Sequence, residues 1–239
     1  MNKIEKEFKK SQDYYLKCYE DSELIELSTD NVAKVEAMIH FNSSYGMKFA
    51  QNCKDLAPVL KGETKLSKEA YRKLLEETII AIDSENSTHL NSDGAGREEI
   101  TERLLAVPKN DLIKYLEDPV GTDYKLLKLI AKETTAKGES KNGNARKNRT
   151  NLSFASKFCH YLCFYVFEGK KEQDNYSIYD KVIRKTLPLY TEYYGIEVKK
   201  KDLKDYEYYQ NVIDTVIKKS NSGISRNGFD HLIWYSYKG

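Results

Sequence analysis

The stretch that decides the fold class runs from Asn151 to Pro188 and reads NLSFASKFCHYLCFYVFEGKKEQDNYSIYDKVIRKTLP. Its first part repeats apolar residues at helical spacing, namely Phe154, Phe158, Leu162, Tyr165 and Val166. Asn151 or Ser153 can cap this helix, and a polar turn follows it. Asp180 then precedes a second apolar pattern that stops near Pro188, because proline disrupts a helix interior. The stretch therefore predicts two helices joined by a short turn.

The same periodicity extends to both sides of this stretch. It predicts a helix that Ser28 or Thr29 caps and that ends near Asn42, and a helix that Ser67 caps and that reaches Ile82. It predicts further helices over residues 98–106, 111–117, 124–132, 202–220 and 227–237. No alternating strand pattern longer than a few residues interrupts them. We expect an all-α fold, a compact bundle of about ten helices, as a single unit over residues 1–239. Residues 1–21 would form an N-terminal arm or helix, and residues 137–149 a basic loop.

Composition restricts the function classes. The chain has 239 residues, of which 40% are hydrophobic, and a formal net charge of +2, so any attraction for nucleic acid must come from local patches. The N-terminus has no apolar targeting region and no stretch is long enough to span a membrane. The four Cys lack the spacing of a disulfide framework or a metal site, so we expect packed, reduced thiols and a cytoplasmic protein without a cofactor.

Two polar residues in the deciding stretch have chemistry of interest. Lys157 lies at the border of the apolar stripe, where partial desolvation would lower the pKa of its ammonium and make it a nucleophile that forms a Schiff base. It could instead be a Lys whose stem covers the apolar edge while its head stays in water. Asp180 is a favoured N-cap, and a cap carboxylate that faces a cleft could also stabilise an oxocarbenium-like charge. Spacing alone leaves these interpretations open.

Taken together, the segments Ala155-Ser156-Lys157-Phe158 and Tyr176-Ser177-Ile178-Tyr179-Asp180 resemble the helix-hairpin-helix DNA glycosylase superfamily, especially its 8-oxoguanine DNA glycosylase-like branch. In that superfamily a catalytic Lys opens the second helix of the hairpin, and a catalytic Asp starts the next helix after a short loop. The resemblance implies that Lys157 and Asp180 are catalytic. It also implies that the partner is double-stranded DNA with a modified base and that the protein associates with the nucleoid when it binds DNA. No small-molecule cofactor is expected.

The resemblance implies further site residues. Asn42, Ser43 and Ser44 are the candidates for the residue that fills the gap left by a flipped base, and Phe229, Asp230 and Trp234 would line a base pocket. The glycines that usually precede the Lys element are absent, since residues 149–154 read RTNLSF. Side chains of the basic loop would replace their phosphate contacts, and the candidates are Arg146, Lys147 and Arg149.

Three functions remain to be compared. The first is a DNA glycosylase, with or without AP lyase activity, that flips out and excises a modified or damaged base in DNA repair or in defence against phage. The alternative is a non-catalytic DNA- or protein-binding module on the same helical scaffold. A third is a helical enzyme of another class, although the sequence contains no phosphate-binding loop or metal motif to support it.

Overall fold

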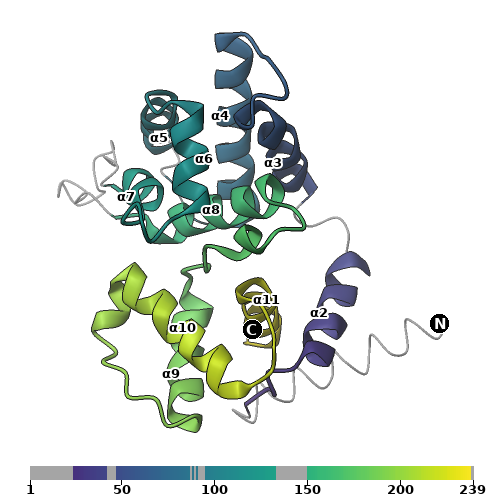
Figure 1. Ribbon diagram of the computed structural model, residues 1–239, viewed down its shortest axis with the longest axis vertical. Coiled ribbons are helices and arrows are strands. Elements are labelled where there is room, and N and C mark those ends of the chain that lie inside the picture. The colour runs from purple at the N-terminus through teal and green to yellow at the C-terminus, as the bar shows by residue number, and fades with distance from the viewer. Residues whose placement is uncertain are drawn as a thin grey trace, which may run out of the picture. The chain divides into compact units, whose positions relative to one another are not determined.

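The computed structural model describes residues 24–41, 47–86, 88, 90, 95–132 and 150–237. Within these ranges the regular elements are ten α-helices, α2 to α11, and two short 3-10 helices, and no strand is present (Figure 1). The all-α class is therefore confirmed, whereas the specific glycosylase fold stays a prediction. The expected N-terminal arm over residues 1–21 and the basic loop over residues 137–149 lie outside the described residues.

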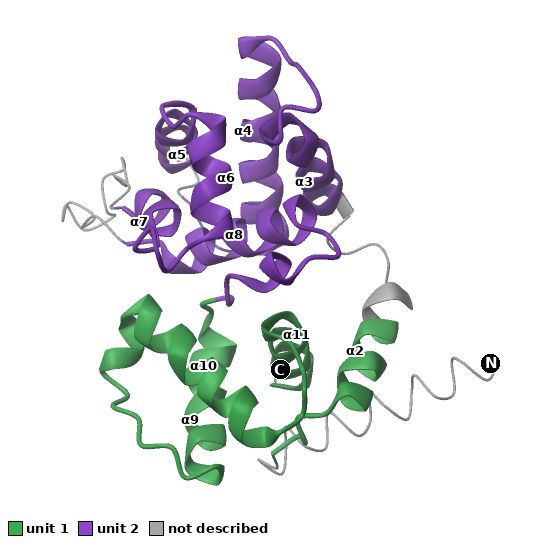
Figure 2. Cartoon of the chain, viewed as in Figure 1, with its two compact units in different colours: residues 1–43, 179–239 green, residues 44–178 purple. Residues whose placement is uncertain are grey.

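The chain divides into two compact units (Figure 2). Unit 1 combines residues 1–43 with residues 179–239, and unit 2 is the continuous stretch 44–178. The described α-helices of unit 1 are α2 (Thr29–Phe41), α9 (Lys181–Tyr193), α10 (Tyr206–Ser220) and α11 (Arg226–Tyr237). That the whole chain acts as a single unit stays a prediction.

Unit 1 joins the two ends of its sequence through buried polar contacts. The Tyr190 hydroxyl donates to the carbonyl oxygen of Ile25 at 2.9 Å, and the amide of Ile25 donates to the Tyr237 hydroxyl at 3.1 Å. Gly228 lets α11 approach α2 closely, because a Cβ at this position would lie 3.1 Å from a methyl carbon of Val32. These contacts hold residues near the start of the chain against its last helix.

Unit 2 contains α3 (Met47–Leu60), α4 (Lys68–Glu85), α5 (Ala95–Leu105), α6 (Lys109–Glu117), α7 (Lys125–Ala131) and α8 (Leu152–Val166). The last of these packs against α3, α4, α6 and α7. Residues 154–160 of α8 are all buried, because this most apolar helix of the sequence is stable only where its side chains are removed from water. None of the described helices combines the length and the apolar character needed to cross a membrane.

Several helix starts agree with the caps expected from the sequence. The side chain of Ser67 accepts a hydrogen bond from the amide of Ala70 at 3.1 Å, and Ser28 accepts one from the amide of Asn31 at 3.2 Å. Asn151 occupies the N-cap position of α8, but its side chain makes no capping hydrogen bond. Short polar side chains before an apolar pattern thus identified most of these starts correctly.

The sequence analysis wrongly predicted the end of one helix at a proline and missed another helix that contains one. The helix α9 does not stop near Pro188 but continues to Tyr193. A proline in the fourth or a later position removes one backbone hydrogen bond, and the buried Leu187 and Tyr190 on either side offset that loss. The sequence analysis also assigned no helix to α3, which contains Pro58 in its interior. In both cases burial of an apolar face outweighs a local penalty.

Candidate functional site

Lys157 lies on the second turn of α8 and exposes only 7% of its surface. Its ammonium donates a hydrogen bond to the backbone carbonyl oxygen of Asn86, with Nζ and oxygen 3.4 Å apart. Asn86 is the C-cap of α4, and the C-terminal end of a helix attracts a cation. Lys157 is therefore a buried amine held at a helix end, and its catalytic role stays a prediction.

Asn86, the partner of Lys157, is also bound by Tyr161, which in turn contacts α3. The Tyr161 hydroxyl, one turn after Lys157, donates to Oδ1 of Asn86 at 2.8 Å. The ring of Phe49 on α3 stacks on the ring of Tyr161 with centroids 4.3 Å apart. Asn86 thus binds two side chains on one face of α8. Sequence analysis missed Asn86 and Tyr161, although Tyr161 shares a helix face with Lys157 through its i+4 spacing.

The thiols near Lys157 are packed in the core. Cys159 and Cys163 are buried, and desolvation raises the pKa of both well above its usual value. His160 between them donates its Nδ1 proton to the carbonyl oxygen of Tyr176 at 2.7 Å. Over the part of the chain that the structure describes, no group of three or more His, Cys, Asp or Glu is placed to hold a metal ion.

Asp180 belongs to unit 1, whereas Lys157 belongs to unit 2, and the division falls between Ile178 and Tyr179. Oδ1 of Asp180 accepts a hydrogen bond from the amide of Ile183 at 2.9 Å, so Asp180 is the N-cap of α9. Its side chain is nonetheless buried, with 7% of the residue exposed. Most capping side chains lie at the surface, so this carboxylate differs from an ordinary cap.

A second buried carboxylate lies in the same unit as Asp180. Asp230 on α11 is buried, and Tyr209 on α10 is fully buried. Burial is the main cause that raises the pKa of the Tyr209 hydroxyl, and the negative charges of Asp230 and Asp180 raise it further. The Tyr209 hydroxyl therefore stays protonated, under the influence of Asp180 at the start of α9 and Asp230 on α11. Sequence analysis singled out Asp180 and Asp230 separately and missed Tyr209, which only the tertiary structure relates to both.

Aromatic rings surround this polar group. The ring of Tyr179 meets the ring of Tyr209 edge-on, with centroids 5.0 Å apart. The guanidinium carbon of Arg184 also lies close to Tyr179, 4.8 Å from its ring centroid. Nε of Arg184 also donates to the backbone carbonyl oxygen of Asp180 at 3.3 Å. The start of α9 is thus held by contacts on both sides of its capping residue.

The expected base-pocket residues lie on α11 in different surroundings. Phe229 is 1% exposed and its ring meets that of Tyr190 edge-on at 6.0 Å, so it packs in the core of unit 1. Trp234 is partly exposed and packs against the ring of Tyr235. The other expected contacts to DNA lie outside the described residues: Asn42, Ser43, Ser44, Arg146, Lys147 and Arg149.

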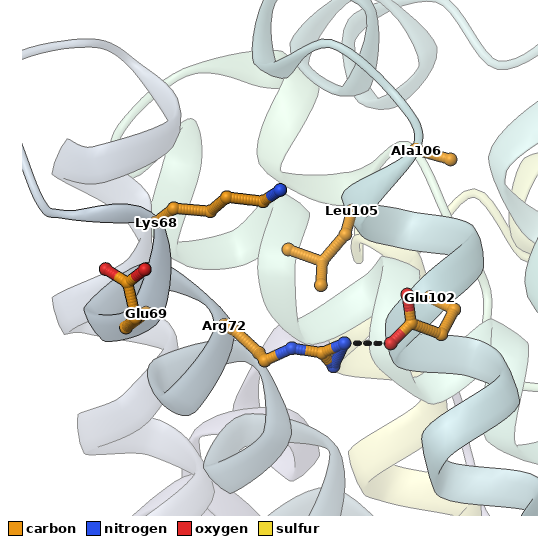
Figure 3. Close-up of a pocket in the computed structure, with 6 residues that line it drawn as sticks. All are labelled: Lys68, Glu69, Arg72, Glu102, Leu105 and Ala106. Carbon is orange, nitrogen blue, oxygen red and sulfur yellow. Dashed lines mark hydrogen bonds and ion pairs between the residues drawn. The ribbon is translucent and has the colours of Figure 1, made fainter.

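A cleft of about 390 Å³ in unit 2 lies between the start of α4 and the end of α5, and the sequence analysis did not anticipate it (Figure 3). Its lining residues are Lys68, Glu69, Arg72, Glu102, Leu105 and Ala106. Arg72 and Glu102 point toward one another and form an ion pair across it (Figure 3). Neither Lys157 nor Asp180 lines this cleft, so it is separate from the residues discussed above.

Comparison of the chain with protein-family models, with curated proteins and with solved structures found no match.

Proposed function

We propose that this chain is a DNA glycosylase that flips a modified or damaged base out of double-stranded DNA and excises it. Lys157 is the nucleophile and Asp180 is the carboxylate that assists departure of the base. The observation that carries the proposal is the burial of both groups, each 7% exposed, one near the start of α8 and the other at the N-cap of α9, with the 3-10 helix Lys171–Asp174 between these two α-helices. Lys and Asp side chains are seldom buried, so two such residues in successive α-helices are candidates for a functional role.

The order of the elements supports the same proposal. A buried amine near the start of α8, then a turn, then a buried Asp at the start of α9, is the order of the superfamily that the sequence resembles. The thiols of α8 are protonated and buried, so they do not compete with Lys157 as nucleophiles.

The chemistry can be written with balanced bonds. After Lys157 loses a proton and releases its hydrogen bond to Asn86, its amine attacks C1′ of the flipped nucleotide. The bond between C1′ and the base nitrogen breaks, and the base leaves with the electron pair and takes up a proton. The carboxylate of Asp180 stabilises the positive charge that develops at C1′ and the ring oxygen. Water accepts the proton that Lys157 loses before the attack and the proton that the new amine at C1′ loses after it. The ring oxygen then takes up a proton as its bond to C1′ breaks, and the opened sugar is a protonated imine, the intermediate of a lyase reaction.

The test combines base release with covalent trapping. Duplexes that contain oxidised, alkylated, deaminated or hypermodified bases are incubated with the full chain, with and without borohydride, which reduces the imine to a stable amine. We expect base release and a trapped adduct with at least one duplex. Lys157→Ala should abolish trapping, and Asp180→Asn should slow base release by about 100-fold or more.

Matched controls separate catalysis from structure. Asp205 caps α10 through the amide of Tyr208 at 2.8 Å, as Asp180 caps α9, but Asp205 is exposed. Because Asn is also a good N-cap, Asp205→Asn should leave base release unchanged, as should replacement of the exposed Lys170 by Ala. If Lys157→Ala traps as well as wild type, the role of Lys157 is wrong. Duplex binding without base release would favour the non-catalytic alternative.

A further inference from the structure

Three cations lie on one face of α9 directly after Asp180. Lys181, Arg184 and Lys185 are all exposed, and their i, i+3 and i+4 spacing places them side by side. We name these three residues the α9 basic stripe. The first turn of α9 contains no acidic residue, and Glu192, the one acid of this helix, lies near its other end.

This arrangement does not stabilise the helix. Cations near a helix N-terminus oppose the helix dipole, and like charges at i and i+4 repel. In the described part of the chain, none of the three forms an ion pair with a carboxylate. The stripe therefore concentrates positive potential near the N-terminus of α9, and local positive potential attracts anions.

Arg184 is already held in place within the stripe. Its guanidinium lies over the buried Tyr179 ring, 4.8 Å from the centroid, and its Nε donates to the carbonyl oxygen of Asp180. A side chain ordered before binding loses less entropy when a ligand arrives. Guanidinium groups also match phosphate oxygens with two parallel hydrogen bonds. Arg184 is thus suited to a specific contact with one phosphate group rather than to non-specific attraction of anions.

We propose that the α9 basic stripe binds the phosphate backbone of double-stranded DNA and positions a strand at the Asp180 end of α9. The identity of the occupant rests on the proposed glycosylase function. From Lys181 to Lys185 the stripe covers four helical rises, about 6 Å along the helix, which is close to the roughly 7 Å that two nucleotides occupy along one strand. It is distinct from the basic residues of 137–149, so it supplies phosphate contacts that the missing glycines do not.

The test measures binding of the full chain to an unmodified duplex over a range of salt concentrations. The variant carries Lys181→Gln, Arg184→Gln and Lys185→Gln. The matched control carries Lys204→Gln, Lys218→Gln and Lys219→Gln, which removes three exposed cations from other elements of unit 1. Each phosphate contact contributes about 0.9 to the slope of log Kd against log salt. We expect the slope of the stripe variant to be smaller than that of wild type by about 2 to 3, and its affinity at low salt to be at least about tenfold lower. The control should bind like wild type.

The stripe variant should unfold at the same temperature as wild type or higher, because the substitutions remove charges that oppose the helix dipole. Equal salt slopes for the stripe variant and the control would overturn the proposal, as would a wild-type Kd that does not respond to salt. If the stripe variant binds duplex DNA as tightly as wild type and still releases base, the role of the stripe in DNA binding is wrong but the glycosylase function stands. A wild-type chain that binds through the stripe but releases no base would instead contradict the glycosylase function.

Discussion

At the residue scale, burial keeps several reactive groups of this chain neutral. Desolvation raises the pKa of the thiols of Cys53, Cys159 and Cys163, and it raises the pKa of the Tyr190 and Tyr209 hydroxyls. Thiols and phenols act as nucleophiles only in their charged forms. These residues therefore serve packing and hydrogen bonding, which leaves Lys157 as the candidate nucleophile of α8.

Tyr190 offers a residue-scale prediction about stability. Its hydroxyl is buried, donates to the Ile25 carbonyl oxygen and lies 3.2 Å from the Tyr237 hydroxyl. Tyr190→Phe leaves these buried groups with fewer partners, so it should lower the free energy of unfolding by about 1 to 3 kcal/mol. Urea denaturation followed by circular dichroism measures this change.

The control for Tyr190→Phe is on the same helix. The Tyr193 side chain is 69% exposed, so Tyr193→Phe should change the free energy of unfolding by less than about 0.5 kcal/mol. If both substitutions have the same effect, the buried hydroxyl contacts do not stabilise unit 1.

At the scale of elements, the end of α4 organises the surroundings of Lys157. Asp83, one turn before Asn86, is buried and receives the Arg97 guanidinium of α5 on Oδ2, with nitrogen to oxygen distances of 2.9 and 2.6 Å. Its other oxygen, Oδ1, accepts from the Thr88 hydroxyl at 2.6 Å and from the amide of Leu90 at 2.9 Å. One carboxylate thus holds the chain after α4 and ties it to α5.

Replacing Asp83 tests that arrangement. Asp83→Asn keeps the shape but leaves a buried ion pair without its negative partner, so it should lower the free energy of unfolding by about 3 kcal/mol. Asp123→Asn is the matched control, because Asp123 pairs with Lys128 at an exposed site and such pairs contribute little. Thermal unfolding of the two variants beside wild type checks the expectation. Equal shifts in both would show that the Asp83 contacts add nothing beyond a surface pair.

At the scale of the whole molecule, the two units differ in how the chain builds them. Unit 2 is continuous in sequence, whereas unit 1 needs residues from both ends of the chain. The core of unit 2 is α8, which packs on four other helices of the same unit. A continuous stretch with its own core is expected to fold independently.

The fragment 44–178 tests this expectation. It should show a helical circular dichroism spectrum and a single cooperative unfolding transition on its own. Asp83→Asn should destabilise the fragment as much as it destabilises the full chain, since the contacts of Asp83 all lie in unit 2. A non-cooperative transition would mean that unit 2 depends on residues outside 44–178.

The sequence by itself determined the all-α class, the helix of residues 152–166 and most helix starts. These features depend on residues within one or two turns of each other: apolar repeats, and caps such as Ser67 and Asp180 that bond an amide three residues later. Local interactions of this kind are encoded in adjacent positions, so they can be read without knowing the fold. The candidate pair Lys157 and Asp180 was also singled out at this level.

Only the tertiary structure decided how far α9 extends beyond Pro188, that Asn86 receives the ammonium of Lys157, and that Tyr209 feels the charges of both Asp180 and Asp230. These outcomes depend on groups between 21 and 71 positions apart, or on burial that outweighs a local preference. The free energy of burying an apolar face exceeds the loss of one helical hydrogen bond, and electrostatic effects grow where water is excluded. Such effects arise only when distant segments are packed together, which is why sequence spacing did not contain them.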